Sequence, residues 1–166
     1  LTDAQVAFVG SDGNIWLARP DGSDQRVAIQ PGVELGMSRL VVSPDGSMVA
    51  QADPRRAPIR IWHTGDGRLV EIPGSDQCIA PQFTADSQRL VYTCTLDPTG
   101  LFPEPPGLVL SSAVDGSDPR VELPMPVGAP GGIDDVRLAD GAMLVSAWRD
   151  TDEGQGSLPH TVLYDA

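Results

Sequence analysis

Short turns built around aspartate and glycine recur along the chain at regular intervals. One kind of turn contains Gly22, Gly67 or Gly116, so that successive copies lie 45 and 49 residues apart. A second kind separates two apolar segments, and it occurs at 43–46, 84–87 and 138–141. Asp hydrogen-bonds the backbone two residues on, and Gly tolerates the positive φ of a tight bend. Both kinds therefore predict sharp chain reversals between short elements.

The segments between these turns are predicted to be β-strands. They are short, apolar and partly β-branched, and none shows the ~3.6-residue period of an amphipathic helix. A repeat of ~40–50 residues with four strands is typical of a β-propeller blade. The expected strands, in four successive units, are 5–10, 14–19 and 25–29; then 38–43, 47–52, 58–63 and 68–72; then 78–83, 89–95, 107–113 and 120–123; and finally 133–138, 142–148 and 160–165.

We therefore expect an all-β fold of four-stranded antiparallel blades, about three and a half in number, forming a partial or small propeller. The units of this single propeller-like domain span roughly 1–32, 33–74, 75–126 and 127–166. The first unit lacks its innermost strand and the last lacks its outermost, which leaves open strand edges. Pairing with a second copy or with another propeller segment is expected. The absence of an initial Met and of a signal peptide favours a mature protein or an excised domain, part of a larger propeller or assembly.

The charge balance excludes two classes of partner. Lys plus Arg number 11 against 23 Asp plus Glu, a net charge of −12. Nucleic acids and anionic membrane surfaces both require a basic footprint, so neither is an expected partner. No apolar run approaches the ~20 residues of a membrane span, so no membrane insertion is expected. All 11 basic residues are Arg, which is typical of a GC-rich bacterial genome.

Two segments carry a resemblance to a known repeat family. LVVSPDGSMVA (40–50) and VAFVGSDGNIWL (6–17) are similar to the strand-turn-strand signature of TolB-type propeller repeats. IRIWHTGDG (59–67) also resembles the third strand and turn of WD repeats, but His63 stands where those repeats usually carry Asp. The TolB-like group is therefore favoured. It implies a non-enzymatic protein-interaction or sensory module outside the cytoplasm, whether periplasmic, at the cell surface or secreted.

Catalytic motifs are missing from the sequence. It has no Gly-x-Ser-x-Gly nucleophile elbow, no His-Glu-x-x-His and no phosphate-binding Gly-rich loop. The only two histidines are His63 and His160. We therefore expect no enzymatic activity and no cofactor. The alternative is an accessory propeller of a prolyl-peptidase-like hydrolase or a lyase, whose catalytic residues lie outside this chain.

The aspartates of the turns allow two interpretations. Turn hydrogen bonding explains most of them. The second interpretation is a calcium site, because Ca²⁺ takes clustered oxygen ligands. Its candidate ligands are Asp21, Asp24, Asp115 and Asp118.

The two cysteines flank one predicted hairpin. When residues are counted outward from the turn, Cys78 and Cys94 lie opposite each other to within one residue. Opposite Cβ atoms in a sheet come close enough for a disulfide, although two buried free thiols are the alternative. A disulfide would place the protein in an oxidising compartment.

The longer connections indicate where partners bind. In a four-stranded meander, the short Asp-Gly turns emerge on one side of the ring and the longer connections on the other. Function concentrates on loops held by a rigid scaffold, so we expect a protein partner on the second side, unless these loops are merely tolerated insertions. The expected contacts are Arg55, Arg56, Leu101 and Phe102.

Overall fold

The computed structural model describes residues 5–31, 35, 39–53, 57–95, 106–124, 132–139, 142–150 and 157–165. Over these residues the chain forms fourteen β-strands in four antiparallel sheets, and no helix. Each strand falls on a segment expected from the sequence, with ends that differ by a few residues. The fold is therefore an all-β partial propeller, as the turn period predicts.

The sheets take their strands in chain order. Sheet 1 contains β1 (Val6–Val9), β2 (Ile15–Ala18) and β3 (Arg26–Ile29). Sheet 2 contains β4 (Arg39–Val42), β5 (Met48–Asp53), β6 (Ala57–His63) and β7 (Leu69–Glu71). Sheet 3 contains β8 (Cys78–Phe83), β9 (Arg89–Thr95), β10 (Pro106–Ala113) and β11 (Arg120–Pro124). Sheet 4 contains β12 (Gly132–Ala139), β13 (Ala142–Asp150) and β14 (Ser157–Asp165).

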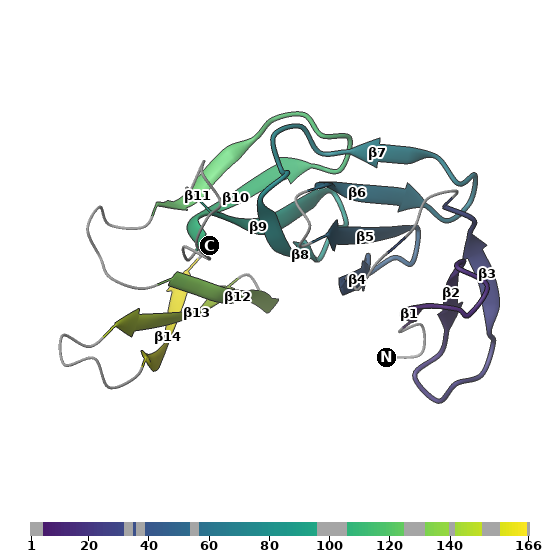
Figure 1. The fold of residues 1–166 in the computed structure, drawn as a ribbon, viewed down its shortest axis with the longest axis horizontal. Coiled ribbons are helices and arrows are strands. Elements are labelled where there is room, and N and C mark those ends of the chain that lie inside the picture. Colours follow the sequence, from purple (N-terminus) through teal and green to yellow (C-terminus); the bar gives the residue numbers. More distant parts are fainter. Residues whose placement is uncertain are drawn as a thin grey trace.

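The four sheets follow one another along an arc, from purple sheet 1 to yellow sheet 4 (Figure 1). The strands β4, β8 and β12 lie toward the concave side of the arc, and β7 and β11 lie on its convex side (Figure 1). Each blade is thus a meander that starts at the inside of the arc and ends at its outside. Hairpins of this kind need only short turns, which explains the density of Asp and Gly.

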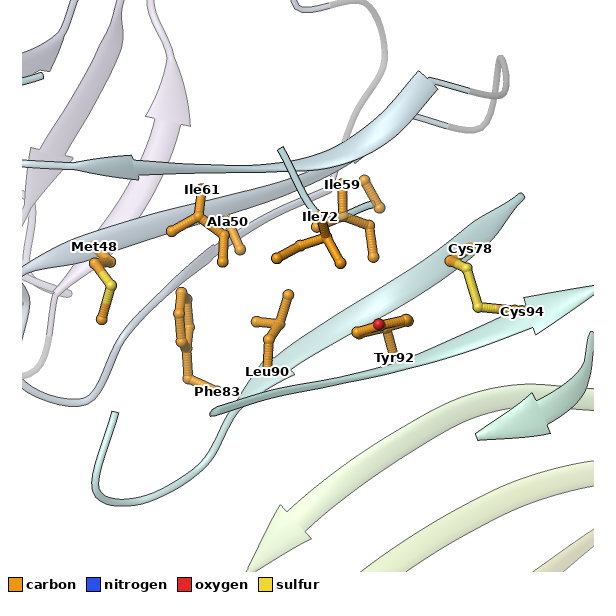
Figure 2. Close-up of a cluster of buried hydrophobic side chains, with 11 residues drawn as sticks. Met48, Ala50, Ile59, Ile61, Ile72, Cys78, Phe83, Leu90, Tyr92 and Cys94 are labelled. Carbon is orange, nitrogen blue, oxygen red and sulfur yellow. A yellow bond between two sulfur atoms is a disulfide. The ribbon is translucent and has the colours of Figure 1, made fainter. Parts of the chain in front are cut away.

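A buried cluster joins sheets 2 and 3. Sheet 2 contributes Met48, Ala50 and Ile61 among others, and sheet 3 contributes Leu90 and Tyr92, all less than a tenth exposed. Figure 2 shows these side chains directed toward one another between the two sheets. Successive residues of a strand point to opposite faces, so each sheet contributes every second residue to this cluster.

A second cluster lies on the other face of sheet 2. Val49 and Trp62, which alternate with the residues of the first cluster, pack there against Ile15 and Leu17 of sheet 1. Sheet 2 is therefore buried on both faces, as a blade inside a propeller must be. Removing apolar surface from water on both faces is the main source of stability in such an array.

The inner strand of sheet 3 contains a bulge. The register with β9 shifts between Ile79 and Gln82, and Ala80 within this bulge has a φ of 52°. A left-handed backbone conformation is costly for a residue with a Cβ atom. Ala80 is followed by Pro81, which has no backbone N–H to donate to the ladder, and proline within a sheet occurs mainly at edge strands and bulges.

Candidate functional site

The inner and outer hairpin turns of the blades meet on one rim of the molecule. We define the inner turns as 43–48 and 84–89 and the outer turns as 19–24, 63–68 and 113–118. In sheet 2 the amide of Thr64 donates to the carbonyl of Ser47 at 2.9 Å, which links an outer turn to an inner one. In sheet 3 the amide of Val114 donates to the carbonyl of Gln88 at 3.1 Å. We call this surface the turn rim.

The inner turns are held by their aspartates. The Asp45 carboxylate accepts hydrogen bonds from the Ser47 amide at 3.0 Å and from the Ser43 hydroxyl at 2.6 Å. The Asp86 carboxylate accepts the same pair of bonds, from the Gln88 amide at 3.0 Å and from the Thr84 hydroxyl at 2.6 Å. Two turns 41 residues apart thus share one hydrogen-bonding scheme.

These hydrogen bonds keep the carboxylates ionised. Partial burial alone would raise the pKa of Asp45, but hydrogen bonds from Ser43, Ser47 and Ser87 outweigh it and lower that pKa to about 2. The Thr84 hydroxyl and the Gln88 amide likewise lower the pKa of Asp86. Neither carboxyl is suited to donate a proton near neutral pH.

The outer turns contain the four candidate calcium ligands. The Asp21 carboxylate accepts from the Ser23 hydroxyl at 2.7 Å and from its amide at 2.9 Å. The Asp115 carboxylate makes the equivalent bonds to Ser117, at 2.6 Å and 2.9 Å. In both turns the hydrogen bond from the serine hydroxyl makes the larger contribution to lowering the pKa of the aspartate, and the bond from the serine amide lowers it further.

The other two candidates pair with arginine. Asp24 lies 2.7 Å from Arg19, and Asp118 lies 2.6 Å from Arg120 and 2.8 Å from Arg89. In the described part of the chain, no three His, Cys, Asp or Glu side chains gather to hold a metal ion. The turns thus use all four carboxylates in hydrogen bonds or ion pairs, and calcium binding stays a prediction that titration calorimetry tests.

One contact on the turn rim crosses between blades. The amide of Asp45 in sheet 2 donates to the Ser87 hydroxyl of sheet 3 at 3.3 Å. Ser87 has a φ of 60° and occupies the position that Gly46 holds in the other inner turn, with a φ of 72°. Sequence reasoning placed Ser87 in a turn but missed this contact. The available signal was a serine at the place where the repeat otherwise has glycine.

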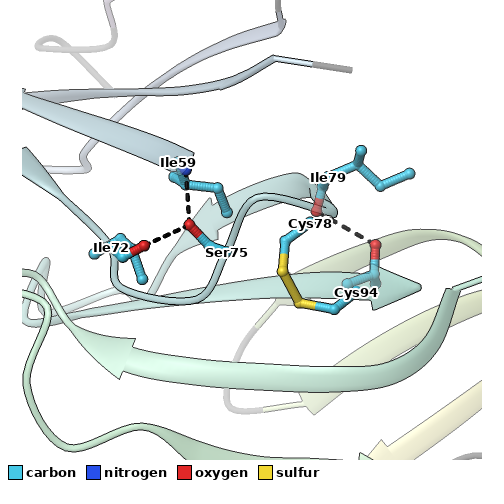
Figure 3. Close-up of a disulfide and its surroundings, with 7 residues drawn as sticks. Ile59, Ile72, Ser75, Cys78, Ile79 and Cys94 are labelled. Atoms are coloured by element: carbon cyan, nitrogen blue, oxygen red, sulfur yellow. Dashed lines mark hydrogen bonds between the residues drawn. A yellow bond between two sulfur atoms is a disulfide. The ribbon is translucent and has the colours of Figure 1, made fainter. Parts of the chain in front are cut away.

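The two cysteines are joined as the hairpin register suggests. Cys78 of β8 lies directly opposite Cys94 of β9, with 4.0 Å between their Cα atoms, and their sulfurs form a disulfide. Both side chains belong to the buried cluster between sheets 2 and 3 (Figure 2). Figure 3 shows the disulfide beside the carbonyl of Ile79, which accepts the hydroxyl of Thr93 at 3.3 Å.

A serine near the disulfide joins two parts of sheet 2. The Ser75 hydroxyl accepts from the amide of Ile59 and donates to the carbonyl of Ile72, both at 2.7 Å (Figure 3). Ser75 is completely buried. It ties the start of β6 to the connection that leads from β7 into sheet 3.

Four residues of the longer connections are predicted to contact a partner. Arg55, Arg56, Leu101 and Phe102 lie outside the described residues. The strands next to them show where the connections start: β5 ends at Asp53 and β6 begins at Ala57, at the end of β6 opposite the turn rim.

In the described part of the chain there is no apolar helix of membrane-spanning length.

Comparison with known proteins identifies the fold. No family model matches the chain, and no curated protein matches its sequence. Solved structures do match it. A putative TolB from Agrobacterium tumefaciens gives a TM-score of 0.67 at 15% identity, over 97% of this chain and 56% of that one. A chain from a nidogen–laminin complex gives 0.61 at 13% identity, over 87% of this chain and 54% of the other.

An enzyme structure matches as well. Oligogalacturonate lyase from Vibrio parahaemolyticus gives a TM-score of 0.59 at 12% identity, over 89% of this chain and 47% of the lyase. The chain thus spans about half the length of these three structures. Identities this low show the fold alone. Together with the repeated turns and with sheet 2, which is buried on both faces, they show that the chain has the fold of a TolB-like β-propeller.

Proposed function

We propose that the chain is a non-enzymatic protein-interaction or sensory module that acts outside the cytoplasm, in the periplasm, at the cell surface or after secretion. The observation that carries this proposal is the Cys78–Cys94 disulfide within the core of a propeller fold. Disulfides persist in oxidising compartments and are rare in the reducing cytosol.

The location is tested by counting thiols. Protein isolated from its own cells under non-reducing conditions and unfolded in denaturant should show no titratable thiol, since the chain has only two cysteines. Two reactive thiols in that protein would contradict an extracytoplasmic location. A sample that is reduced before unfolding is the control, and it should show two titratable thiols.

The non-enzymatic part of the proposal is supported by what the acidic side chains do. On the turn rim, Asp45, Asp86 and Asp115 accept hydrogen bonds from their own turns, and Asp118 pairs with two arginines. These contacts lower the pKa of each carboxyl, which favours a structural role over proton donation. A propeller of similar fold occurs in a nidogen–laminin complex, an assembly of proteins.

We place the partner at the end of the blades opposite the turn rim. The turn rim is occupied by short turns that hydrogen-bond internally, which leaves little backbone free for a partner. The longer connections contain Arg55, Arg56, Leu101 and Phe102. An apolar and cationic set suits a partner surface that is apolar with acidic borders.

A photo-crosslinking amino acid tests this placement. Introduced at Phe102 or Arg56, it should give a specific adduct in cells that express the protein. The matched control carries the same amino acid at Asp66, in an outer turn of the turn rim. Adducts formed from position 66 and not from 56 or 102 would mean that the partner binds the turn rim.

The match to oligogalacturonate lyase favours a second candidate. The chain could be the accessory propeller of a lyase, or of a prolyl-peptidase-like hydrolase, with catalytic residues elsewhere. The coding sequence on either side of this segment distinguishes the two candidates. A hydrolase or lyase domain would favour this candidate, and a membrane anchor would favour the interaction module.

A further inference from the structure

Aspartate followed directly by glycine is the sequence at which a main chain rearranges most readily. The pair occurs six times in this chain, at 12–13, 21–22, 45–46, 66–67, 115–116 and 140–141, and all but the last lie among the described residues. The glycine nitrogen can attack the carboxyl carbon of the preceding side chain, because glycine has no Cβ atom to shield it. All five described aspartates are exposed, so the structure of each turn decides which pair reacts.

The main-chain hydrogen bonds of these five turns are alike. Each glycine amide donates to a carbonyl earlier in its turn, at 2.8 to 3.0 Å. Each aspartate carboxylate accepts the amide of the residue two positions on, at 2.9 to 3.1 Å. The difference between the turns therefore lies in the side chains that hold the carboxylate.

Four of the five carboxylates accept a further hydrogen bond from a side chain. The Trp16 indole donates to Asp12 at 3.1 Å. The hydroxyl of the serine two positions on donates to Asp21 at 2.7 Å and to Asp115 at 2.6 Å. Two serine hydroxyls donate to Asp45, at 2.6 and 2.8 Å. Hydrogen bonding holds these four carboxylates in place and lowers the pKa of each, which favours the ionised form over the neutral carboxyl that ring closure needs.

The fifth carboxylate, that of Asp66, accepts no side-chain hydrogen bond in the described part of the chain. The residue two positions on is Arg68, and its guanidinium lies 2.6 Å from Nε2 of His63 instead. The hydroxyl two positions before, on Thr64, donates to the carbonyl of Gly46 at 3.1 Å. The amide of Arg68 therefore provides the single hydrogen bond that the described residues make to this carboxylate, at 3.0 Å.

The tip of this turn is also open. Among the described residues, a Cβ atom placed on Gly65 or Gly67 would meet no heavy atom within 4 Å. One placed on Gly46 or Gly116 would lie 3.2 or 3.0 Å from a side chain of another segment. Residues 66 and 67 can therefore close into a ring without displacing a neighbouring strand.

We propose that Asp66 and Gly67 form the site at which the folded protein isomerises to isoaspartate, while side-chain hydrogen bonds protect the Asp-Gly pairs of the other four described turns. The Gly67 nitrogen bonds to Cγ of Asp66, and its proton leaves with the carboxyl hydroxyl as one water molecule. Water then re-enters the five-membered succinimide at either carbonyl carbon. Opening at the main-chain carbon gives isoaspartate, in which the chain continues through the former side-chain carboxyl, and the mass of the protein is unchanged.

The product alters the turn rim. Isoaspartate adds one carbon atom to the main chain within the turn 63–68. Two hydrogen bonds of 2.9 Å close this turn, from the His63 amide to the Arg68 carbonyl and from the Gly67 amide to the His63 carbonyl. The longer loop changes the geometry of both bonds, whereas the buried clusters lie on the strands and keep their contacts.

Prolonged incubation of the folded, oxidised protein at neutral pH tests the proposal. Trypsin releases residues 61–68 as one peptide, in which Asp66 is the only aspartate. Isoaspartate should appear as a second chromatographic peak of unchanged mass, which an endoprotease that cuts before aspartate does not cleave. The other four described pairs should accumulate at least about fivefold less isoaspartate, the factor to which one hydrogen bond of ordinary strength corresponds.

Two substitutions at one position isolate the cause. Arg68→Ser gives Asp66 the serine that Asp21 and Asp115 have two positions on, and should slow isomerisation at 66 by about fivefold. Arg68→Ala is the matched control, because it removes the same side chain and supplies no hydroxyl, and it should react like the wild type. Trypsin releases residues 61–89 from both variants, and fragmentation in the mass spectrometer assigns the isoaspartate to its position. Circular dichroism and the thiol count verify that both are folded and oxidised.

The proposal is overturned if position 66 of the folded protein forms no isoaspartate, or forms no more than positions 12, 21, 45 or 115. Equal rates in Arg68→Ser and Arg68→Ala overturn it as well. In denaturant the turns are lost, and the five pairs of the wild type should react at similar rates. The same preference for position 66 there would mean that neighbouring residues in the sequence, and not the folded turn, select the site.

Discussion

Two buried serines of this protein should respond in opposite ways to the same substitution. Ser75 and Ser112 are both completely buried. The Ser75 hydroxyl makes two hydrogen bonds of 2.7 Å, to Ile59 and Ile72 (Figure 3). The Ser112 hydroxyl has no hydrogen-bond partner among the described residues. Replacing each with alanine removes the same atoms from very different surroundings.

The structure gives the size of the difference. Ser75→Ala leaves the buried amide of Ile59 without this acceptor, which costs about 1–3 kcal/mol, and loses a second bond worth about 1 kcal/mol. The carbonyl of Ile72 still accepts the Ser75 amide at 3.4 Å, so its loss is partial. We expect Ser75→Ala to lower the free energy of unfolding by about 3 kcal/mol. Ser112→Ala removes a desolvated hydroxyl, so it should be neutral or stabilising by about 1 kcal/mol.

Urea unfolding under non-reducing conditions, followed by circular dichroism, measures both changes. For a chain of this size, about 3 kcal/mol corresponds to a fall of roughly 9 °C in Tm. The slope of the unfolding free energy with urea should be the same in all three proteins, which checks that the folded state is intact. Equal losses in the two variants, or a loss below about 0.5 kcal/mol for Ser75→Ala, would refute the reasoning.

Three further predictions follow from the disulfide, the inner turn and the outer turns. Replacing Cys78 and Cys94 with alanine opens a loop closed across 16 residues, and should lower the unfolding free energy by about 3 kcal/mol in urea, a change that reduction of the wild type should reproduce. Folding lowers the pKa of Asp45 from its ordinary value of 3.8 to about 2, so the stabilisation from its ionised carboxylate is present above pH ~4 and lost as the pH falls toward 2. Solvent screening at this largely exposed site limits the contribution to about 1 kcal/mol, and Asp45→Asn should flatten the pH dependence of Tm in that range. Gly116→Ala should lower the free energy of unfolding by about 1 kcal/mol more than Gly67→Ala. Both glycines have a positive φ, but a Cβ atom at position 116 would lie 3.0 Å from Pro73, whereas one at position 67 would meet nothing within 4 Å. Equal Tm values for the two variants would contradict this contact.

The sequence by itself determined the local structure of this protein. The strands follow from short apolar segments, and their ends follow from Asp and Gly, because a turn depends on residues within a few positions of one another. The pairing of Cys78 with Cys94 could be predicted for the same reason, since a tight hairpin turn sets the register of its two strands. The equivalence of Asp21 with Asp115 likewise comes from the spacing of the turns.

Only the tertiary structure decided which apolar faces are covered. Trp62 and Tyr92 are buried between sheets, whereas Phe8, an aromatic residue in a similar strand, is 39% exposed. Alternation along a strand identifies two faces but not the sheet that lies on each, because that sheet comes from a distant part of the chain. The Ser87 contact with Asp45 escaped prediction for the same physical reason, because it depends on how one blade meets its neighbour.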